Sequence, residues 1–344
     1  MTSRDRVNTA IKGKQPDRVP VWCLLSLEHI INWGTNDGRI PKTIEDLVKA
    51  ECNLARRYHF DGSLVYLPGN KSGTRVDSFI GKTLTETPQG DSSHIFETAD
   101  PEAWQKNIQP YQPEDFYSSH LTREILGNDQ HLGGWAADGY SRALQWFPSL
   151  EDALLAMIDD PPRFKALVEY FDEQSVAWAR AQIELGQLES IQISSPYAGS
   201  SFMSVEMYMQ FVLPSVRKLA QAIKPVGGAA YLHTCGSISD RLETMAETDI
   251  DGMECMDPPP LGNVSLKEAK KRVGSRIFLK GNIDSVNVLL QGEDETIDKT
   301  IRKTIAEGMP DGGYILSTAC SVSPLVPPER VCRLWELADQ FGQY

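Results

Sequence analysis

The chain has 344 residues, of which 41% are hydrophobic and 24% are charged, so it can bury a large core as one domain or as two smaller ones. Its formal net charge of −13 argues against anionic partners, so neither nucleic acid nor an anionic membrane is an expected target. No run of about 18 or more apolar residues predicts a membrane span. These features predict an ordinary soluble protein of enzyme size.

The six cysteines are scattered along the chain and form no dense disulfide framework. They are Cys23, Cys52, Cys235, Cys255, Cys320 and Cys332. The amino-terminal segment has an amphipathic helical pattern without the apolar stretch of a signal peptide. We therefore expect a cytoplasmic protein whose thiols stay reduced, a setting that is compatible with a metal site.

Short apolar and β-branched runs alternate with long helical patterns, which is typical of a mostly parallel sheet. Eight runs predict strands, at residues 18–25, 62–67, 131–136, 190–194, 229–234, 252–256, 276–281 and 313–318. Between them, helices are predicted at residues 150–185, 205–223, 266–273 and 293–307, several after Ser, Asp or Pro start signals. The pattern predicts a (β/α)8 TIM barrel, with a doubly wound open sheet as the alternative.

Residues 69–129 fit this alternation least well, because they are rich in Thr, Ser, Gln and Pro. We interpret them as an insertion after the second strand, a candidate lid in which residues 78–83 and 94–97 form a small hairpin; a decorative insertion is the alternative. No internal repeat and no Gly- or Ser-rich linker divides the chain. Residues 1–344 are therefore interpreted as a single domain.

Two residues of metal-ligand type, His233 and Cys235, stand two positions apart in the run Tyr-Leu-His-Thr-Cys-Gly-Ser. In an extended segment such side chains project to the same side. Cys320 follows the eighth predicted strand, and the carboxyl ends of barrel strands meet at one face. Two thiolates and an imidazole favour zinc, and three protein ligands are typical of a catalytic zinc site with an open position. The alternative is a core histidine beside two ordinary buried thiols.

Other polar residues follow predicted strands at the same face. Glu254 lies at the end of the sixth strand, Asn282 follows the seventh, and Tyr197 follows the fourth. Glu254 is the candidate for an acid partner of the metal, or for a fourth ligand that substrate displaces. Tyr197 and Asn282 are candidates for orienting substrate. The alternative for each is a capping role in a loop or at a helix N-terminus.

Residues 5–21 read Asp-Arg-Val-Asn-Thr-Ala-Ile-Lys-Gly-Lys-Gln-Pro-Asp-Arg-Val-Pro-Val. This segment resembles the start of the uroporphyrinogen decarboxylase superfamily. Residues 204–214, 233–236 and 279–284 are similar to further landmarks of this family, so the resemblance covers nearly the whole chain. It implies a (β/α)8 barrel and one of two activities. These are decarboxylation in the porphyrin pathway and zinc-dependent methyl transfer with corrinoids.

The chain departs from the decarboxylase branch at two places. Where that branch has an Arg-Gln-Ala-Gly-Arg-Tyr signature, residues 22–29 read Trp-Cys-Leu-Leu-Ser-Leu-Glu-His and offer no arginine for substrate carboxylates. Where that branch has a Gly-His pair, this chain has Ala319 and Cys320. The methyltransferase branch is similar to this chain at both places, and it implies that the H-x-C-G run and the distant cysteine bind zinc.

The resemblance implies a methyltransferase that moves a methyl group between a small methylated substrate and the cobalt of a corrinoid. No D-x-H-x-x-G run for cobalt ligation is present, so we expect the corrinoid on a separate partner protein. We expect a methyl ether as substrate in an O-demethylation, because Trp22, Trp135 and Trp146 could line an aryl site, although tryptophans also pack in cores. Alternatives are a methyltransferase acting on a thiol such as coenzyme M, a decarboxylase-like lyase, and a non-catalytic zinc-stabilised scaffold that docks a corrinoid protein.

Overall fold

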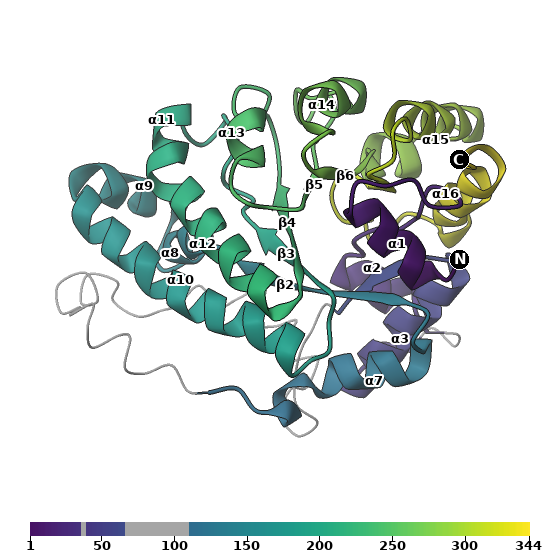
Figure 1. The fold of residues 1–344 in the computed structure, drawn as a ribbon, viewed down its shortest axis with the longest axis horizontal. Helices are drawn as coiled ribbons and strands as arrows, with labels where there is room; N and C mark the ends of the chain where they lie inside the picture. Colours follow the sequence, from purple (N-terminus) through teal and green to yellow (C-terminus); the bar gives the residue numbers. More distant parts are fainter. Residues whose placement is uncertain (36–38, 66–109) are drawn as a thin grey trace.

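The computed structural model describes residues 1–35, 39–65 and 110–344. Within these ranges the strands form one parallel sheet of seven strands in sequential order, curled into a barrel (Figure 1). The strands are β1 (Gly62–Leu64), β2 (His131–Ala137), β3 (Ser190–Ser194), β4 (Ala229–Thr234), β5 (Gly252–Cys255), β6 (Phe278–Ile283) and β7 (Tyr314–Thr318). Because the strands are parallel neighbours, all their carboxyl ends open on the same face.

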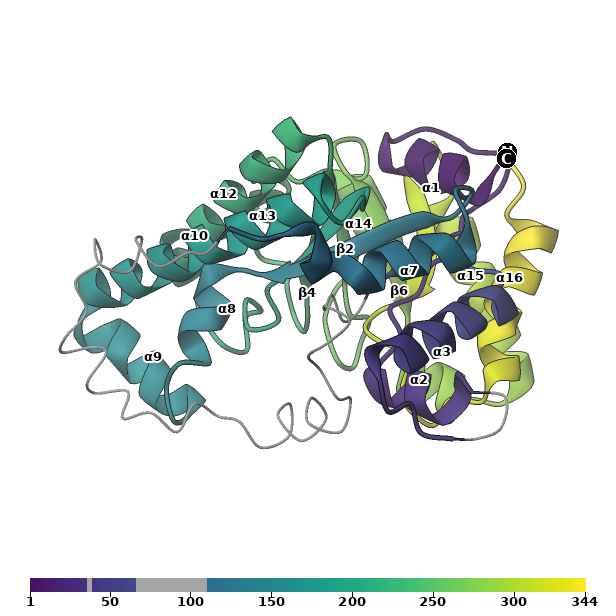
Figure 2. The same cartoon turned by 90° about the horizontal axis from the view of Figure 1, so that it is seen from below.

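Helices connect successive strands and cover the outside of the barrel (Figures 1 and 2). Before β3 they are α1 (Ser3–Ile11), α2 (Leu27–Trp33), α3 (Ile44–Arg57), η1 (Pro113–Phe116), α7 (Tyr117–Leu126), α8 (Gly139–Leu144), α9 (Leu150–Asp159) and α10 (Pro161–Glu184). After β3 they are α11 (Val205–Met207), η2 (Tyr208–Val212), α12 (Leu213–Ile223), η3 (Lys224–Val226), α13 (Leu242–Ala246), α14 (Leu266–Val273), η4 (Ser285–Leu290), α15 (Asp294–Gly308) and α16 (Pro328–Phe341). None of the described helices is both long and apolar enough to span a membrane.

Residues 18–25, the first predicted strand, occupy the eighth position in the barrel wall without forming a regular strand. On one side Trp22 donates its amide to Leu316 at 3.0 Å, and Leu316 donates to Pro20 at 2.9 Å. On the other side Asp61 donates its amide to Val21 at 2.7 Å. Pro20 has no amide proton, so the hydrogen-bond ladder is interrupted there. The TIM-barrel prediction is confirmed, but residues 18–25 do not form the predicted eighth regular strand, so the described ranges contain seven.

The predicted helix over 150–185 is divided into α9 and α10. Asp160 precedes two prolines, a position that disfavours helical backbone, and its side chain caps α10 by accepting from the Arg163 amide at 3.2 Å. The predicted helix over 205–223 contains a π-helical segment, η2. Of the predicted insertion 69–129, residues 113–126 form η1 and α7, and α7 packs against α3. The predicted hairpin at 78–83 and 94–97 lies outside the described residues.

Helix α1 covers the amino end of the barrel. Its Val7 and Ala10 pack against Trp22, Tyr231 and Phe278, which belong to a cluster that fills the barrel interior. The side chain of Trp22 is fully buried there. The amino end of the barrel is therefore closed by apolar packing.

A buried ionic network ties α1 to the barrel wall. The carboxylate of Asp61, which is fully buried, accepts from Arg6 at 2.6 Å, from Arg18 at 2.8 Å and from the amide of Val21 at 2.9 Å. Arg6 also donates to Asp17 at 2.6 Å. These bonds join α1, the extended segment of residues 18–25 and the residue that precedes β1. They therefore stabilise the place where residues 18–25 complete the barrel wall.

Candidate metal centre

Four side chains with metal-binding atoms meet at the carboxyl ends of the strands. His233 lies on β4, Cys235 follows that strand, Cys255 ends β5 and Cys320 follows β7. One nitrogen of the imidazole and the three Sγ atoms all lie within 4.8 Å of one another. The structure therefore brings together the three ligands predicted from the sequence and adds a fourth, Cys255.

The spacing of these atoms suits a tetrahedral metal ion. The Sγ of Cys235 lies 3.5 Å from Nε2 of His233 and 3.9 Å from the Sγ of Cys255. The Sγ of Cys320 lies 4.0 Å from the same nitrogen. A tetrahedral zinc ion with bonds of about 2.3 Å to sulfur holds two sulfur ligands about 3.8 Å apart. Imidazole and thiolates are also donor types that zinc prefers, so these residues fit a zinc ion.

Cys255 reaches this cluster because the backbone leaves the strand conformation there. Successive strand residues point to opposite faces, so Glu254 and Cys255 cannot both face the site in a regular strand. The φ angles are +78° at Cys255 and +48° at Met256, in a region that non-glycine residues rarely adopt. Residues in such conformations cluster at functional sites. The sequence signal that could have identified it is a third cysteine at the end of a neighbouring predicted strand.

The orientation of His233 is fixed from behind by Glu254. Nδ1 of the imidazole donates to Oε1 of Glu254 at 2.6 Å, which leaves Nε2 free to face the three sulfur atoms. Glu254 also accepts from Lys280 and from Gln192, and all of these side chains are buried. A carboxylate behind a metal-binding imidazole is a common arrangement that selects the tautomer and raises ligand basicity.

Glu254 is held in its ionised form. Burial opposes its charge, but the ammonium of Lys280 and the hydrogen bond from His233 outweigh burial and lower the pKa of Glu254 to about 2. Lys280 in turn lies 4.7 Å from the centre of the Trp22 ring. The structure places Glu254 behind the imidazole, away from the cysteine side of the ring.

The three thiols cannot all ionise without a counter-charge. Hydrogen bonds from Cys235 and Cys255 lower the pKa of Cys320, whereas burial raises the pKa of Cys255 well above its ordinary value. One negative charge is therefore favoured in the cluster and further ones are opposed. A bound divalent cation would offset two of the three thiolate charges and would lower the pKa of each coordinated thiol.

Asp257 connects the two loops that carry Cys235 and Cys255 through hydrogen-bond contacts. Its Oδ2 accepts from the Gly236 amide at 2.7 Å, and its Oδ1 lies 3.4 Å from the Sγ of Cys255. Gly236 has a φ of +77°, so this turn suits a residue without a side chain. No role for Asp257 was predicted from the sequence, yet its carboxylate is in hydrogen-bond contact with Cys255 of the cluster.

The two residues predicted to orient substrate lie at the same face but outside the cluster. The amide of Asn282 is buried and donates to the Met256 carbonyl at 2.9 Å. The ring of Tyr197 is half-buried and packs edge-on against Phe202, with ring centres 5.6 Å apart. In the part of the chain that the structure describes, no hydrogen bond joins either residue to the cysteines, so their substrate roles stay predictions. Trp22 lies in the barrel core, so that residue does not line an aryl site.

A family model described as uroporphyrinogen decarboxylase (URO-D) matches residues 2–341. The chain is 29% identical over 350 residues to the methylcobamide:CoM methyltransferase MtaA of Methanosarcina barkeri, a match that covers 99% of this chain and 98% of the relative. It is 24% identical over 347 residues to a uroporphyrinogen decarboxylase of Arthrobacter sp. (strain FB24), covering 96% and 95%. A solved methyltransferase from Methanosarcina mazei covers 99% of both chains with a TM-score of 0.72 at 19% identity, which supports the fold.

Proposed function

Because the chain belongs to the uroporphyrinogen decarboxylase family, we propose that it is a zinc-dependent methyltransferase that moves a methyl group from the cobalt of a separate corrinoid protein to a thiol. The observation that carries this proposal is the cluster of one imidazole and three thiols at the carboxyl ends of β4, β5 and β7. That face is where barrel enzymes hold their catalytic residues. The full-length similarity to a methylcobamide:CoM methyltransferase supports the same reaction class.

Each residue of the cluster has a distinct part in this proposal. His233, Cys235 and Cys320 hold the metal, and Glu254 acts as a positioning residue that fixes the imidazole tautomer. A zinc ion bound there would lower the pKa of a coordinated substrate thiol, so that the thiolate is available near neutral pH. Cys255 is the ligand that substrate displaces, because Asp257 offers its thiol a second hydrogen-bond partner at 3.4 Å.

The geometry favours a thiol over a methyl ether as the methyl acceptor or donor. Release of an alcohol from an ether needs a proton donor beside the metal. Glu254, the residue predicted for that task, is ionised and paired with Lys280 behind the imidazole. Thiolate ligands also place negative charge on the ion, which makes a coordinated sulfur more nucleophilic. We therefore propose thiol methylation in place of the O-demethylation expected from the sequence.

The test combines metal content with methyl transfer. The purified protein is expected to contain one zinc per chain, and to demethylate methylcobalamin in the presence of a small thiol. Cys320→Ala is expected to lose both zinc and activity. Cys332→Ala removes a half-buried cysteine on α16 that lies outside the cluster, and it should keep both.

Two outcomes would contradict the proposal in different ways. A Cys320→Ala variant that retains full zinc would remove the metal assignment. Methylation of cobalt(I) cobalamin by aryl methyl ethers, with no reaction of thiols, would keep the metal and restore the O-demethylase prediction. The panel should therefore contain both substrate classes in the same assay.

A further inference from the structure

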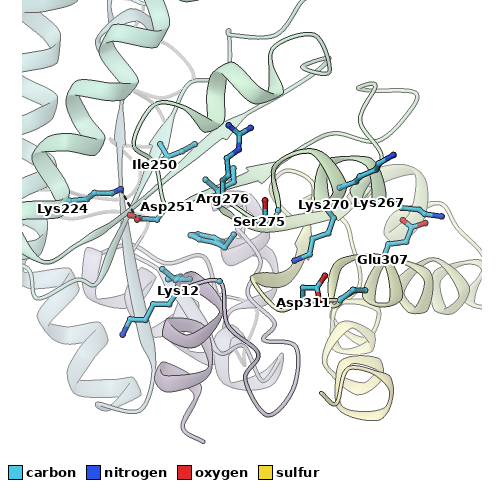
Figure 3. Close-up of a pocket in the computed structure, with 17 residues that line it drawn as sticks. Lys12, Lys224, Ile250, Asp251, Lys267, Lys270, Ser275, Arg276, Glu307 and Asp311 are labelled. Atoms are coloured by element: carbon cyan, nitrogen blue, oxygen red, sulfur yellow. Dashed lines mark ion pairs between the residues drawn. The ribbon is translucent and has the colours of Figure 1, made fainter.

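A cavity lies at the opposite end of the barrel from the cysteine cluster. It has a volume of about 890 Å³ and is bounded by the end of α1, by η3, by α14 and by the segments that lead into β5, β6 and β7 (Figure 3). Cavities of this size hold small molecules. Asp251 at its rim and Cys255 in the cluster are four positions apart along a strand, roughly 13 Å at about 3.3 Å per residue, so the two sites are separate.

The cavity is cationic although the protein is acidic. Six cationic and three acidic side chains line it, in a chain whose net charge is −13. The cations are Lys12, Lys224, Lys267, Lys270, Lys271 and Arg276, and the acids are Asp251, Glu307 and Asp311. Lys224 pairs with Asp251 at 3.3 Å, while Arg276 pairs with Glu247 at 3.5 Å. Because like charges gather here without enough counter-charge, an anion is the complementary ligand.

The helix α14 concentrates this charge on one face. Lys267, Lys270 and Lys271 are spaced by three and four residues, so their like charges repel along the helix surface. The helix dipole favours cations in the last turn, which explains Lys270 and Lys271. It opposes Lys267, which lies in the first turn. The position of Lys267 is therefore not explained by the stability of the helix.

Lys270 is the most constrained of these cations. Its ammonium donates to the Gly312 carbonyl, and Figure 3 shows it reaching from α14 toward the loop that carries Asp311. Its stem lies against Gly274, where an added Cβ would come within 2.7 Å of its Cδ. Within the described chain it makes no ion pair, and burial lowers its pKa. Among the described residues its ammonium has one hydrogen-bond acceptor, so its other two N–H groups can donate to a ligand.

The floor of the cavity is apolar. Ile250, Ile277 and Phe278 belong to the core and are no more than 4% exposed, and Ile11 of α1 packs against the cluster that contains Phe278. A hollow with an apolar floor and a cationic rim suits a ligand with a flat apolar part and several negative charges. An extended polyanion would instead meet the acidic remainder of the surface. We propose that this cavity binds a phosphorylated small molecule of the nucleotide type.

The proposal is tested by calorimetric titration of the whole protein with ATP, adenosine, inorganic triphosphate and inorganic phosphate at two salt concentrations. ATP is expected to bind at least about tenfold more tightly than adenosine or inorganic phosphate, and its affinity should fall as salt rises. The double variant Lys267→Gln/Lys271→Gln should weaken ATP binding by about tenfold. The matched double variant Lys49→Gln/Lys299→Gln removes the same charge outside the cavity and should bind as the wild type does.

Melting temperatures of the three proteins without ligand show whether the variants fold. Absence of ATP binding, equal affinities for ATP and adenosine, or equal effects of the two double variants would each overturn the proposal. Tight binding of inorganic phosphate alone would overturn the nucleotide-type ligand and assign a simple anion site. None of these readouts depends on methyl transfer, so the outcome is independent of the proposed activity.

Discussion

The two ends of the barrel differ in whether their buried charged groups have counter-charges within the chain. At the amino end, Asp61 is matched within the chain itself by the guanidinium groups of Arg6 and Arg18. At the carboxyl end, His233 and three cysteines gather donor atoms whose charges the chain does not balance. The first arrangement is complete in the folded polypeptide, whereas the second fits an added cation. The comparison indicates that the Asp61 network serves stability, and it supports the chemical role proposed for the carboxyl-end cluster.

Removal of the metal is the strongest test of the difference between the stabilising network at the amino end and the proposed metal centre at the carboxyl end. Chelation is expected to reduce methyl transfer by about 1,000-fold or more, equivalent to about 4 kcal/mol of transition-state stabilisation. The barrel should stay folded, because its core is built from apolar side chains outside the cluster. Residual activity and the circular-dichroism melting curve check the two halves of the prediction. Global unfolding on chelation would instead support the zinc-stabilised scaffold.

The amino end should respond to mutation with lost stability and unchanged chemistry. Asp61→Asn leaves two nearly buried arginines without their shared carboxylate, and is expected to lower the free energy of unfolding by about 3 kcal/mol or more. Asp17→Asn removes a partly exposed partner of Arg6 and should change that free energy by less than about 1 kcal/mol. Urea denaturation measures both. Equal effects of the two substitutions would contradict the role given to the Asp61 network.

Glu254 lies behind the carboxyl-end cluster, so its replacement should act through His233. Glu254→Gln keeps an acceptor for Nδ1 but loses the charge that faces Lys280. A drop of roughly 10- to 100-fold in zinc affinity or activity is expected, as for other carboxylates behind a metal-binding histidine. Zinc affinity is measured by competition with a chromogenic chelator. Full zinc affinity with abolished turnover would favour the acid role predicted from the sequence.

Two carboxyl groups should give opposite responses to pH. Burial, partly offset by a hydrogen bond from Ser215, raises the pKa of Asp172 to about 7, whereas the hydrogen bond from Arg6 lowers the pKa of Asp17 to about 2. Because its pKa is raised in the folded protein, the Asp172 carboxyl stabilises the folded state at pH values below its unfolded pKa. This stabilisation is lost as pH rises through 7. Asp17 favours folding at pH values above its unfolded pKa, and this contribution is lost as pH falls through 2.

The corresponding measurement is urea denaturation of Asp172→Asn and Asp17→Asn between pH 4 and pH 7. The stability of Asp172→Asn relative to the wild type should rise across this range. The difference for Asp17→Asn should stay nearly constant, because Asp17 is ionised in both states over most of the range. A flat profile for Asp172→Asn would show that the carboxyl of Asp172 keeps an ordinary pKa.

Much of the fold was predictable because its signals are local. The alternation of apolar runs and helical patterns predicted the barrel, and strands β2, β3 and β4 begin where they were predicted. The spacing of His233 and Cys235 in an extended run placed both on one side of a strand. Local signals failed at Pro20, where an extended segment pairs on both sides without regular strand geometry, because pairing depends on neighbours distant in sequence.

The sequence by itself determined the barrel, the three candidate ligands His233, Cys235 and Cys320, and the acidic net charge that disfavours polyanions. Only the tertiary structure decided that Cys255 joins the cluster, because a left-handed backbone turn overrides strand alternation there. It also decided that Glu254 stands behind the imidazole, because Lys280 of the next strand holds the carboxylate in place. Ligand type follows from residue identity, whereas the direction in which a side chain points at a strand end follows from contacts between strands.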